Sequence, residues 1–355
     1  IASVAEKYFS ELFTAGGTEC DSDTFIPTNQ VSMDMNTWLI RPVTESEIRE
    51  AAFNIGQDRA PGHDGFSGAF YQQFWDVISS DVSKMVHAFF DNGVMDPSVN
   101  HTQLCLIPKS TDASMIKDYR PISLCTVGYK VISNILMARM KDCLHGLISE
   151  SQAAFVPGRH IQDNVMVAHE LMHALKSKKD IAEGYMGIKT DISKAYDRVE
   201  WNFLEKVMKK LGFHDIWTGW VMNCVKTVTY SILINGADYG RGQPTRGLRQ
   251  GDPISPYLFL LCAEVLSQLF QKAERENRFK GLKIARSCPS VSHLLFADDS
   301  LFFCRATVSD CQQVASLLKE YEEYSGQRVN LENSSITFGM KIDDSQSPHL
   351  KTIFG

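Results

Sequence analysis

The sequence predicts an α+β fold, and three observations support that prediction. The chain has 355 residues, 44% of them hydrophobic and 22% charged, so it can bury a sizeable core. Residues 199–211 and 258–269 place apolar side chains at helical spacing. Residues 227–236 and 291–304 contain short apolar runs joined by turn residues. Helices and hairpins in a chain of this length indicate one large domain or two to three subdomains.

Composition excludes several classes of protein. The longest apolar run, residues 257–266, is shorter than the ~20 residues needed to cross a bilayer, and the N-terminus lacks a signal-peptide pattern. We therefore expect an intracellular protein without a membrane partner. The net charge of -6 argues against a protein that simply coats nucleic acid, but it is compatible with an enzyme that has a local basic channel. The nine cysteines include no Cys-x-x-Cys pair, which argues against a zinc ribbon.

The N-terminal part is predicted to be mostly helical after an irregular lead-in, residues 1–40, which has weak helical periodicity near residues 5–13. Thr44 and Glu47 have the spacing of a capping box, so a helix should begin there and end at Gly56. The loop 60–65 is rich in glycine and proline but lacks the Gly-Lys-Ser/Thr of a phosphate-binding loop. An aromatic helix is expected through Phe70, Phe74 and Trp75.

Two strands are predicted next, at residues 104–109 and 119–124, each with a cation beside a proline. Lys109 and Arg120 are either ordinary surface charges or two positive groups on a rigid hairpin that suits a triphosphate. A long helix is expected over residues 127–145, followed by the loop 152–159.

The next predicted helix, residues 163–176, contains His169-Glu170-Leu171-Met172-His173. This pattern matches the zinc-binding motif of metalloproteases, which also requires a third ligand. Apolar residues from Val165 to Leu175 form a broad face on the same helix. We therefore interpret the segment as an ordinary packed or surface helix.

Asp191 is the first candidate for catalysis, because it stands at the end of a predicted strand, residues 185–192, with no local structural role. Asp197 is predicted to cap the next helix, with Glu200 at the capping-box position. Tyr196 lies between strand and helix, close to any ligand of Asp191.

Asn235-Gly236 predicts a tight hairpin turn after residues 227–234. A loop rich in glycine and arginine, residues 240–251, then leads to a helix with Ser255 as N-cap. The N-terminus of that helix, beside the side chain of Gln250, is a natural binding site for a polar, anionic substrate.

Phe296-Ala297-Asp298-Asp299 is predicted to form a hairpin turn between the apolar runs 291–296 and 301–304. Two adjacent carboxylates repel each other unless solvent or a cation screens them, so the turn is either solvated or a platform for a divalent metal. Ser309 and Gln312 are predicted to cap a helix that ends at Gly326, followed by short strands at residues 327–331 and 335–338.

Six blocks in this order resemble the successive motifs of a reverse transcriptase, most closely those of non-LTR (LINE-type) retrotransposons, particularly of plant genomes. The blocks are Ile107-Pro108-Lys109, Asp118 to Leu124, Phe155 to Arg159, Asp191 to Asp197, Gln250 to Pro253, and Phe296 to Asp299. The loop 60–65 resembles the additional N-terminal block of these enzymes, and the match spans roughly residues 44–338.

The resemblance implies the fingers and palm of a right-hand polymerase, with an antiparallel palm sheet backed by helices and the thumb and endonuclease missing from this stretch. The implied regions are a lead-in (1–40), fingers (41–184), palm (185–235 and 256–340), a loop with the Gln-Gly block (236–255) and the start of a thumb connection (341–355).

It also implies a site. Asp191, Asp298, Asp299 and the backbone carbonyl of Ile192 would hold two Mg²⁺ ions, with Mn²⁺ as a possible substitute. The deoxynucleoside triphosphate would contact Lys109, Arg120, Tyr196, Gln250 and Gly251, and Arg159 would touch the template backbone.

The implied partners are an RNA template, a DNA primer or target and a deoxynucleoside triphosphate, in a cytoplasmic ribonucleoprotein and then the nucleus. The sequence departs from the family pattern at Asn333, where relatives commonly carry a lysine that could protonate pyrophosphate. Two alternatives therefore stay open: a catalytically dead nucleic-acid-binding remnant, and a maturase-type reverse transcriptase of introns.

Overall fold

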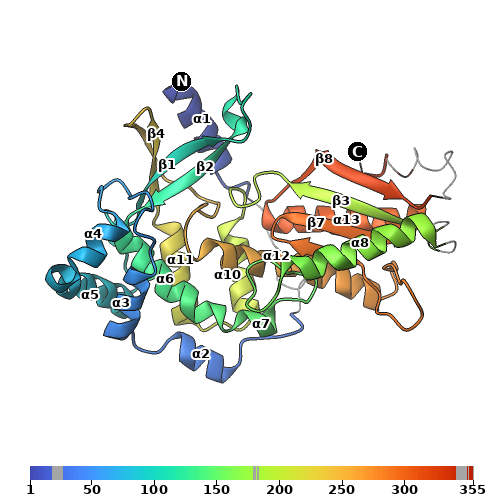
Figure 1. Ribbon diagram of the computed structural model, residues 1–355, viewed down its shortest axis with the longest axis horizontal. Helices are drawn as coiled ribbons and strands as arrows, with labels where there is room; N and C mark the ends of the chain where they lie inside the picture. Colours follow the sequence, from blue (N-terminus) through green and yellow to red (C-terminus); the bar gives the residue numbers. More distant parts are fainter. Residues whose placement is uncertain (18–26, 179–180, 182–183, 341–349, 351, 355) are drawn as a thin grey trace. The chain divides into compact units, whose positions relative to one another are not determined.

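The computed structural model describes residues 1–17, 27–178, 181, 184–340, 350 and 352–354. They form two compact units, each assembled from segments distant in sequence (Figure 1). Unit 1 comprises residues 1–16, 30–143 and 196–259, and unit 2 comprises residues 17–29, 144–195 and 260–355. Each unit contains a four-stranded sheet and several helices, so the predicted α+β fold is confirmed. Most of residues 341–355, the expected thumb connection, lies outside the described residues.

The sheet of unit 1 has the strand order β2-β1-β4-β5. Its strands are β1 (His101–Pro108), β2 (Tyr119–Cys125), β4 (Thr229–Ile234) and β5 (Ala237–Gly242). β1 and β2 pair antiparallel, as predicted, while β1 pairs parallel to β4. β4 and β5 form the predicted hairpin, with Asn235 and Gly236 as its two turn residues.

Helix α1 (Ala2–Leu12) packs on this sheet, so the expectation of an irregular lead-in was wrong. Ala5, Phe9 and Leu12 are buried in one cluster with Leu104 and Ile232. The periodicity near residues 5–13 is only a weak signal for this helix, because packing rather than intrinsic propensity supplies most of its stability.

Further helices of unit 1 confirm some predicted boundaries and correct others. They are α2 (Met33–Leu39), α3 (Glu45–Phe53), α4 (Gly68–Gln73), α5 (Trp75–Asn92), α6 (Val127–Lys141), α10 (Trp201–Lys210) and α11 (Asp215–Lys226), with the 3-10 turn η1 (Ile116–Asp118) before β2. The Thr44–Glu47 capping box is present at the start of α3. The single aromatic helix is instead two helices, because the backbone of Phe74 leaves the helical conformation.

Asp197 does not cap α10, contrary to the prediction. The N-cap of α10 is Glu200, which makes no side-chain cap bond. Asp197 is buried, and its Oδ1 accepts a hydrogen bond from Gln250 Nε2 at 3.0 Å. Asp197 therefore binds the distant Gln250 instead of the nearby helix start that the spacing suggested.

The sheet of unit 2 has the order β6-β7-β3-β8 and is antiparallel throughout. Its strands are β3 (Tyr185–Ile192), β6 (His293–Phe296), β7 (Asp299–Arg305) and β8 (Val329–Phe338). β3 has the predicted bounds. The two short strands predicted at residues 327–331 and 335–338 are instead the two halves of β8, separated by a register shift.

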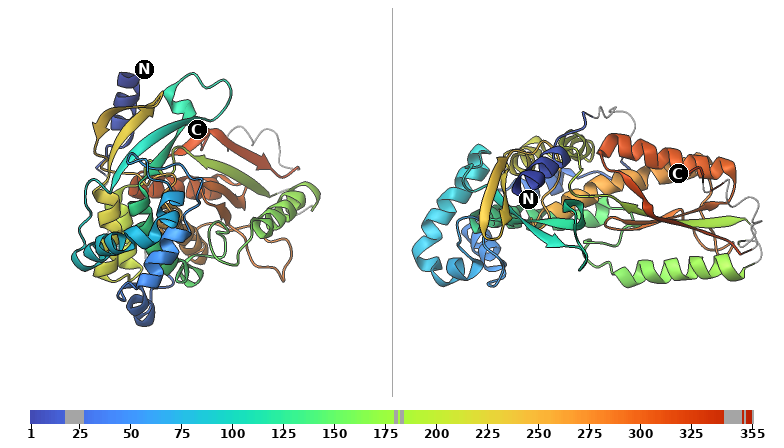
Figure 2. Two further views of the ribbon diagram at one scale, coloured as in Figure 1. Left: turned by 60° about the vertical axis from the view of Figure 1, so that its left-hand side comes forward. Right: turned by 90° about the horizontal axis from the view of Figure 1, so that it is seen from above.

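This sheet lies between helices on its two faces (Figure 2). α8 (Ile161–Ser177) packs on one face, where Leu171 and Leu175 share a cluster with Phe303. α12 (Ser255–Arg275) and α13 (Val308–Ser325) cover the other face. There the ring of Phe270 stacks on that of Phe302, with the ring centroids 4.5 Å apart. Neighbouring residues of β7 therefore face opposite helix layers, as the period of two requires.

Helix α13 ends at Gly326 as predicted, with a φ of 74°. Its N-cap, however, is Thr307, whose side chain accepts a bond from the Asp310 amide, rather than Ser309. The helix predicted over residues 127–145 ends at Lys141, and a short helix α7 (Leu144–Leu147) follows in unit 2. No helix among the described residues has the length and apolar character that a membrane span requires.

Candidate metal centre and nucleotide-binding residues

The three aspartates predicted to bind metal all belong to unit 2, at one end of its sheet. β3 and β7 are antiparallel, with Thr190 opposite Ser300. The next pair along this register is Asp191 and Asp299, and directly opposed residues of antiparallel strands point to the same face. Asp298 lies in the turn that precedes Asp299. The fold therefore brings together carboxylates that are more than a hundred residues apart in the chain.

The turn between β6 and β7 has an unfavourable backbone. Phe296 pairs with Asp299, so Ala297 and Asp298 are the two turn residues. Ala297 has a φ of 53°, and Asp298 is not among the described residues with positive φ. One positive φ, at the first central residue, is the pattern of a type II′ turn, where glycine is the favoured residue. Ala297 stores conformational strain at the position next to the catalytic candidates.

Two asparagines of β8 hold the carboxylate of Asp191. Asn333 Nδ2 and Asn330 Nδ2 both donate to Asp191 Oδ2, at 3.0 and 3.3 Å. The contact depends on the register shift, because β8 pairs with β3 through Ser335 on one side and Asn330 on the other. The residues between them bulge out, and the bulge allows Asn333 to reach Asp191. The sequence singled out Asn333 as a departure from the family pattern but gave no signal for this bond.

The oxygen donors at this edge suit a hard divalent cation. Carboxylates and a backbone carbonyl, such as that of Ile192, are the ligands that Mg²⁺ prefers. Asp299 is two-thirds exposed and forms a long ion pair with Lys189, at 3.9 Å. Within the described part of the chain, no three acidic, histidine or cysteine side chains stand close enough to hold a metal. At this end of the sheet, asparagine side chains hold the carboxylate of Asp191, and Lys189 pairs with the carboxylate of Asp299.

Lys109 and Arg120, the predicted triphosphate contacts, belong to unit 1. Both are exposed at the loop end of the β1–β2 hairpin, where residues 109–118 connect the two strands. Ile107 pairs with Arg120, and the Lys109 amide continues the ladder by donating to Asp118 O at 2.9 Å. The two cations therefore lie on the same face as diagonal neighbours.

Tyr196, Gln250 and Gly251 also belong to unit 1. Tyr196 is half-buried and stacks flat on Phe259, with ring centroids 4.7 Å apart. Gln250 O accepts from the Ser123 amide of β2 at 2.8 Å. Gly251 has a φ of 108°, and a Cβ there would lie 3.1 Å from Ser123 O, so the position requires glycine.

Arg159, the predicted template contact, is engaged by its own unit. Its guanidinium donates to the carbonyls of Ile148, Ser149 and Gln152, at 2.6 to 2.7 Å. Burial lowers the pKa of Arg159. This arrangement gives Arg159 a structural role, and its contact with a template stays a prediction.

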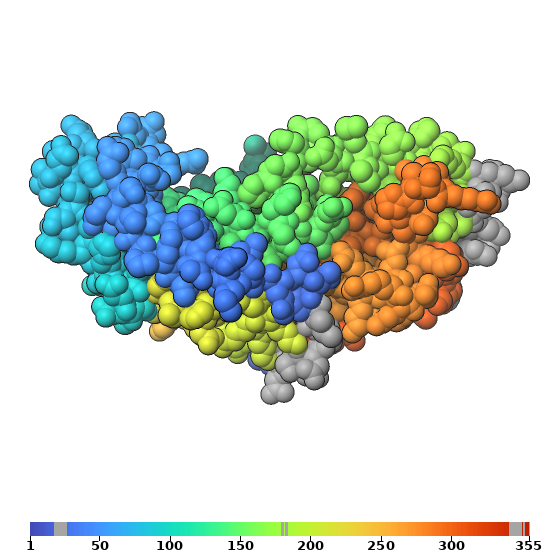
Figure 3. All heavy atoms as spheres, turned by 90° about the horizontal axis from the view of Figure 1, so that it is seen from below, coloured from blue at the N-terminus to red at the C-terminus, as the bar shows by residue number. Residues whose placement is uncertain are grey.

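The His-Glu-x-x-His segment lies on the outer side of α8, where His169, Glu170 and His173 are exposed. Figure 3 shows α8, in green, running along the surface of unit 2. Leu171, Ala174 and Leu175 are buried, which matches an ordinary surface helix. The predicted apolar face is buried only in this half of the helix, since Val165 and Val167 in the other half are exposed.

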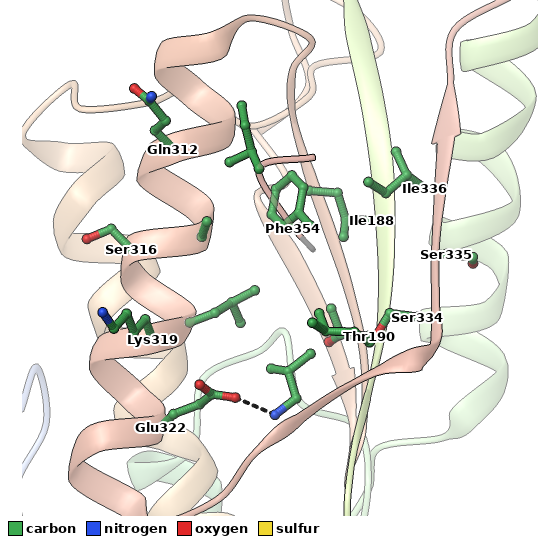
Figure 4. Close-up of a pocket in the computed structure, with 15 residues that line it drawn as sticks. Ile188, Thr190, Gln312, Ser316, Lys319, Glu322, Ser334, Ser335, Ile336 and Phe354 are labelled. Atoms are coloured by element: carbon green, nitrogen blue, oxygen red, sulfur yellow. Dashed lines mark hydrogen bonds between the residues drawn. The ribbon is translucent and has the colours of Figure 1, made fainter. Parts of the chain in front are cut away.

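A cavity of about 740 Å³ lies in unit 2 between α13 and the strands β3 and β8 (Figure 4). Ile188 and Thr190 of β3 face it, with Lys319 and Glu322 on the α13 side. Asp191 is not among its lining residues, because alternate residues of a strand point to opposite faces. This cavity is therefore separate from the acidic edge.

Comparisons with known proteins show the family of the chain. Residues 107–349 match the family described as "Reverse transcriptase (RNA-dependent DNA polymerase)". The "Transposon TX1 uncharacterized 149 kDa protein" of Xenopus laevis is 28% identical over 304 residues, which cover 85% of this chain and 23% of that protein. The "Retrovirus-related Pol polyprotein from type-2 retrotransposable element R2DM" of Drosophila melanogaster is 24% identical, over 86% of this chain and 27% of that protein.

A shorter match is the "Uncharacterized mitochondrial protein AtMg01250" of Arabidopsis thaliana, 54% identical over 69 residues, or 19% of this chain and 57% of that protein. The chain thus spans about a quarter of the length of the TX1 and R2DM relatives. The expected plant origin stays a prediction. Because the family match covers more than half of the chain, the chain belongs to the reverse transcriptase (RNA-dependent DNA polymerase) family and is related to the polymerases of non-LTR retrotransposons.

Proposed function

We propose that this chain catalyses RNA-templated DNA synthesis from a primer 3′-hydroxyl, in target-primed retrotransposition. The observation that carries the proposal is the pairing of Thr190 of β3 with Ser300 of β7, since the residues next to this pair are Asp191 and Asp299, and Asp298 lies in the adjoining turn. In this proposal the sheet of unit 2 is the palm sheet of a right-hand polymerase, and the β1–β2 hairpin belongs to the fingers.

The chain's own residues would hold and orient two Mg²⁺ ions at this edge. Asp191, Asp298, Asp299 and the carbonyl of Ile192 are the proposed ligands. Bound there, Mg²⁺ supplies Lewis acidity that lowers the pKa of a primer hydroxyl and neutralises charge on the departing pyrophosphate. Asn330 and Asn333 hold the Asp191 carboxylate by donating to its Oδ2.

On the substrate side, Lys109 and Arg120 would bind the triphosphate, which needs two cations on one face. Tyr196 would lie under the sugar and exclude a 2′-hydroxyl, while Gln250 and Gly251 would line the nucleotide pocket. The protein's contribution to nucleotidyl transfer is then mainly positioning and charge neutralisation.

Primer extension on an RNA template with Mg²⁺ tests the proposal. Parent chain should extend the primer, and Asp298→Ala should reduce the rate by about a thousandfold, since metal ligation supplies several kcal/mol of transition-state stabilisation. Asp238→Ala is the matched control, because Asp238 is an aspartate close to a hairpin turn that instead accepts hydrogen bonds from Gln103 in unit 1. Its rate should equal that of the parent.

Equal extension by the parent and Asp298→Ala would overturn the proposal. RNA binding without nucleotide incorporation, under Mg²⁺ or Mn²⁺, would instead support a catalytically dead remnant. Asn333, which stands where the family commonly has a lysine, is the reason to consider this alternative. The rate of extension on intron-derived RNA templates, compared with the rate on other RNA templates, would distinguish the maturase-type enzyme.

A further inference from the structure

Gln152 forms an isolated β-bridge beside the candidate metal centre. β6 is at the edge of its sheet, and Gln152 forms a parallel bridge with Leu295 on its outer side. The Leu295 amide donates to Ser151 O at 2.8 Å, and the Ala153 amide donates to Leu295 O at 3.2 Å. Backbone hydrogen bonds thus attach residues 151–153 to the edge strand β6, next to the turn that carries Asp298.

The side chain of Gln152 reaches the turn itself. It is only 1% exposed, and its Oε1 accepts from the amides of Ala154 at 2.9 Å and Ala297 at 3.1 Å. Both partners are backbone N–H groups, which can only donate, so the orientation of the Gln152 amide is fixed. Ala297 is the residue with the unfavourable positive φ. A hydrogen bond from a buried side chain therefore holds the strained residue of the turn.

The amide nitrogen of Gln152 shows that packing alone does not account for this residue. Nε2 is buried and has no hydrogen-bond partner among the described residues. A buried donor without a partner is unfavourable, and an apolar side chain of similar size would avoid that cost. The two bonds to Oε1 are the interactions that an apolar replacement would lose.

Arg159 and Asn164 hold the segment in place. Arg159 Nη1 donates to Gln152 O at 2.7 Å, which links the guanidinium directly to the backbone of Gln152. Asn164 Nδ2 donates to Ser151 O at 3.0 Å and to Leu295 O at 2.9 Å, so it ties the segment to β6.

We infer that Gln152 is a positioning residue for the β6–β7 turn, and that Arg159 acts through it. The inference rests on the proposed function, since the turn matters for catalysis only if Asp298 and Asp299 bind metal. Gln152 contacts the turn backbone rather than the reacting atoms. Its role is to keep Ala297 in the conformation that presents the two aspartates.

Hydrogen exchange of the turn, measured by mass spectrometry on peptides covering residues 293–300 without nucleotide, tests the inference. In Gln152→Met the turn amide loses its acceptor and should exchange about tenfold faster, as expected for loss of one hydrogen bond. Gln268→Met is the matched control. Gln268 is also buried and accepts two bonds from Thr28, far from the turn in sequence. Its turn peptide should exchange at the parental rate.

Arg159→Lys provides a second, milder variant if Gln152→Met does not fold. Lysine keeps the charge but cannot reproduce the fork that binds three carbonyls, so the same peptide should exchange faster by a smaller factor. Peptides from β8 should be unchanged in both variants. Parental exchange of the turn in Gln152→Met, or equal acceleration throughout the sheet, would overturn the inference.

Primer extension supplies the functional readout. Gln152→Met should lower kcat about tenfold, with the KM for the deoxynucleoside triphosphate within about twofold of the parent, because only the orientation of the turn changes. An unchanged kcat alongside a faster-exchanging turn would overturn the positioning role. If the parent chain itself does not incorporate nucleotides, the proposed function fails, while the exchange experiment still decides whether Gln152 holds the turn.

Discussion

The β4–β5 and β6–β7 hairpins both have a two-residue turn, but different interactions stabilise the two turns. The β4–β5 turn uses Asn235 and Gly236, with φ values of 52° and 81°, the residues that favour two positive φ angles. The β6–β7 turn places an alanine at a φ of 53° and an aspartate beside it. Local sequence is sufficient for the first turn, whereas the second depends on Gln152. Strain held in place by distant residues is typical of functional sites.

Acid should distinguish the two hairpins most strongly. His293 of β6 is buried among Ser151, Ser267 and Ser292, and burial lowers its pKa from 6.5 to about 4. Above pH 6.5 the imidazole is neutral in both folded and unfolded chains. Between pH 6.5 and 4 only the unfolded chain takes up the proton, so the free energy of unfolding falls by about 1.4 kcal/mol per pH unit.

Opening free energies from hydrogen exchange at pH 7.0 and pH 5.0 would measure this effect. For β6–β7 the parent should lose about 2 kcal/mol more than His293→Gln, which has no imidazole to protonate. The β4–β5 peptides serve as the internal reference, since the substitution should not change their pH dependence. The same acid sensitivity in parent and variant would show that His293 does not titrate as described.

Substitutions in the two turns should change the free energy of unfolding by smaller amounts, and by different amounts in the two hairpins. Gly236→Ala forces a side chain into a φ of 81° where a Cβ meets no atom within 4 Å, so the cost is conformational, about 1 kcal/mol. Ala297→Gly relieves a similar strain but increases the entropy of the unfolded chain, so stability should change by less than about 0.5 kcal/mol. Urea unfolding of each variant provides the measurement. A large loss in Ala297→Gly would mean that the alanine methyl group contributes packing.

These hairpins also show how far sequence reasoning can go. The Asn235-Gly236 turn, the capping box of Thr44 and the bounds of β3 follow from local preferences, and each was confirmed. The cap at Thr307 was missed because Ser309 has an equally suitable side chain two residues later. Local spacing cannot decide between two such caps.

Several long-range contacts could not be predicted from local sequence patterns. Asp197 looked like a helix cap, yet it binds Gln250. The bulge of β8 that brings Asn333 to Asp191 appeared only as a gap between two predicted strands. Gln152 lay in the predicted loop 152–159, but nothing in its neighbours indicated a bond to Ala297. Each depends on a partner more than fifty residues away, which no local pattern specifies.

In the proposed function, Asp191 and Asp298 act together as one metal centre for RNA-templated synthesis. Single-nucleotide incorporation on an RNA template, measured for Asp191→Asn, Asp298→Asn and the double variant, tests it most directly. Groups that act as a unit have non-additive effects, so each single variant should lose about a thousandfold in rate and the double variant about the same. Losses that multiply in the double variant, or full activity in either single variant, would show that Asp191 and Asp298 do not act as one metal centre.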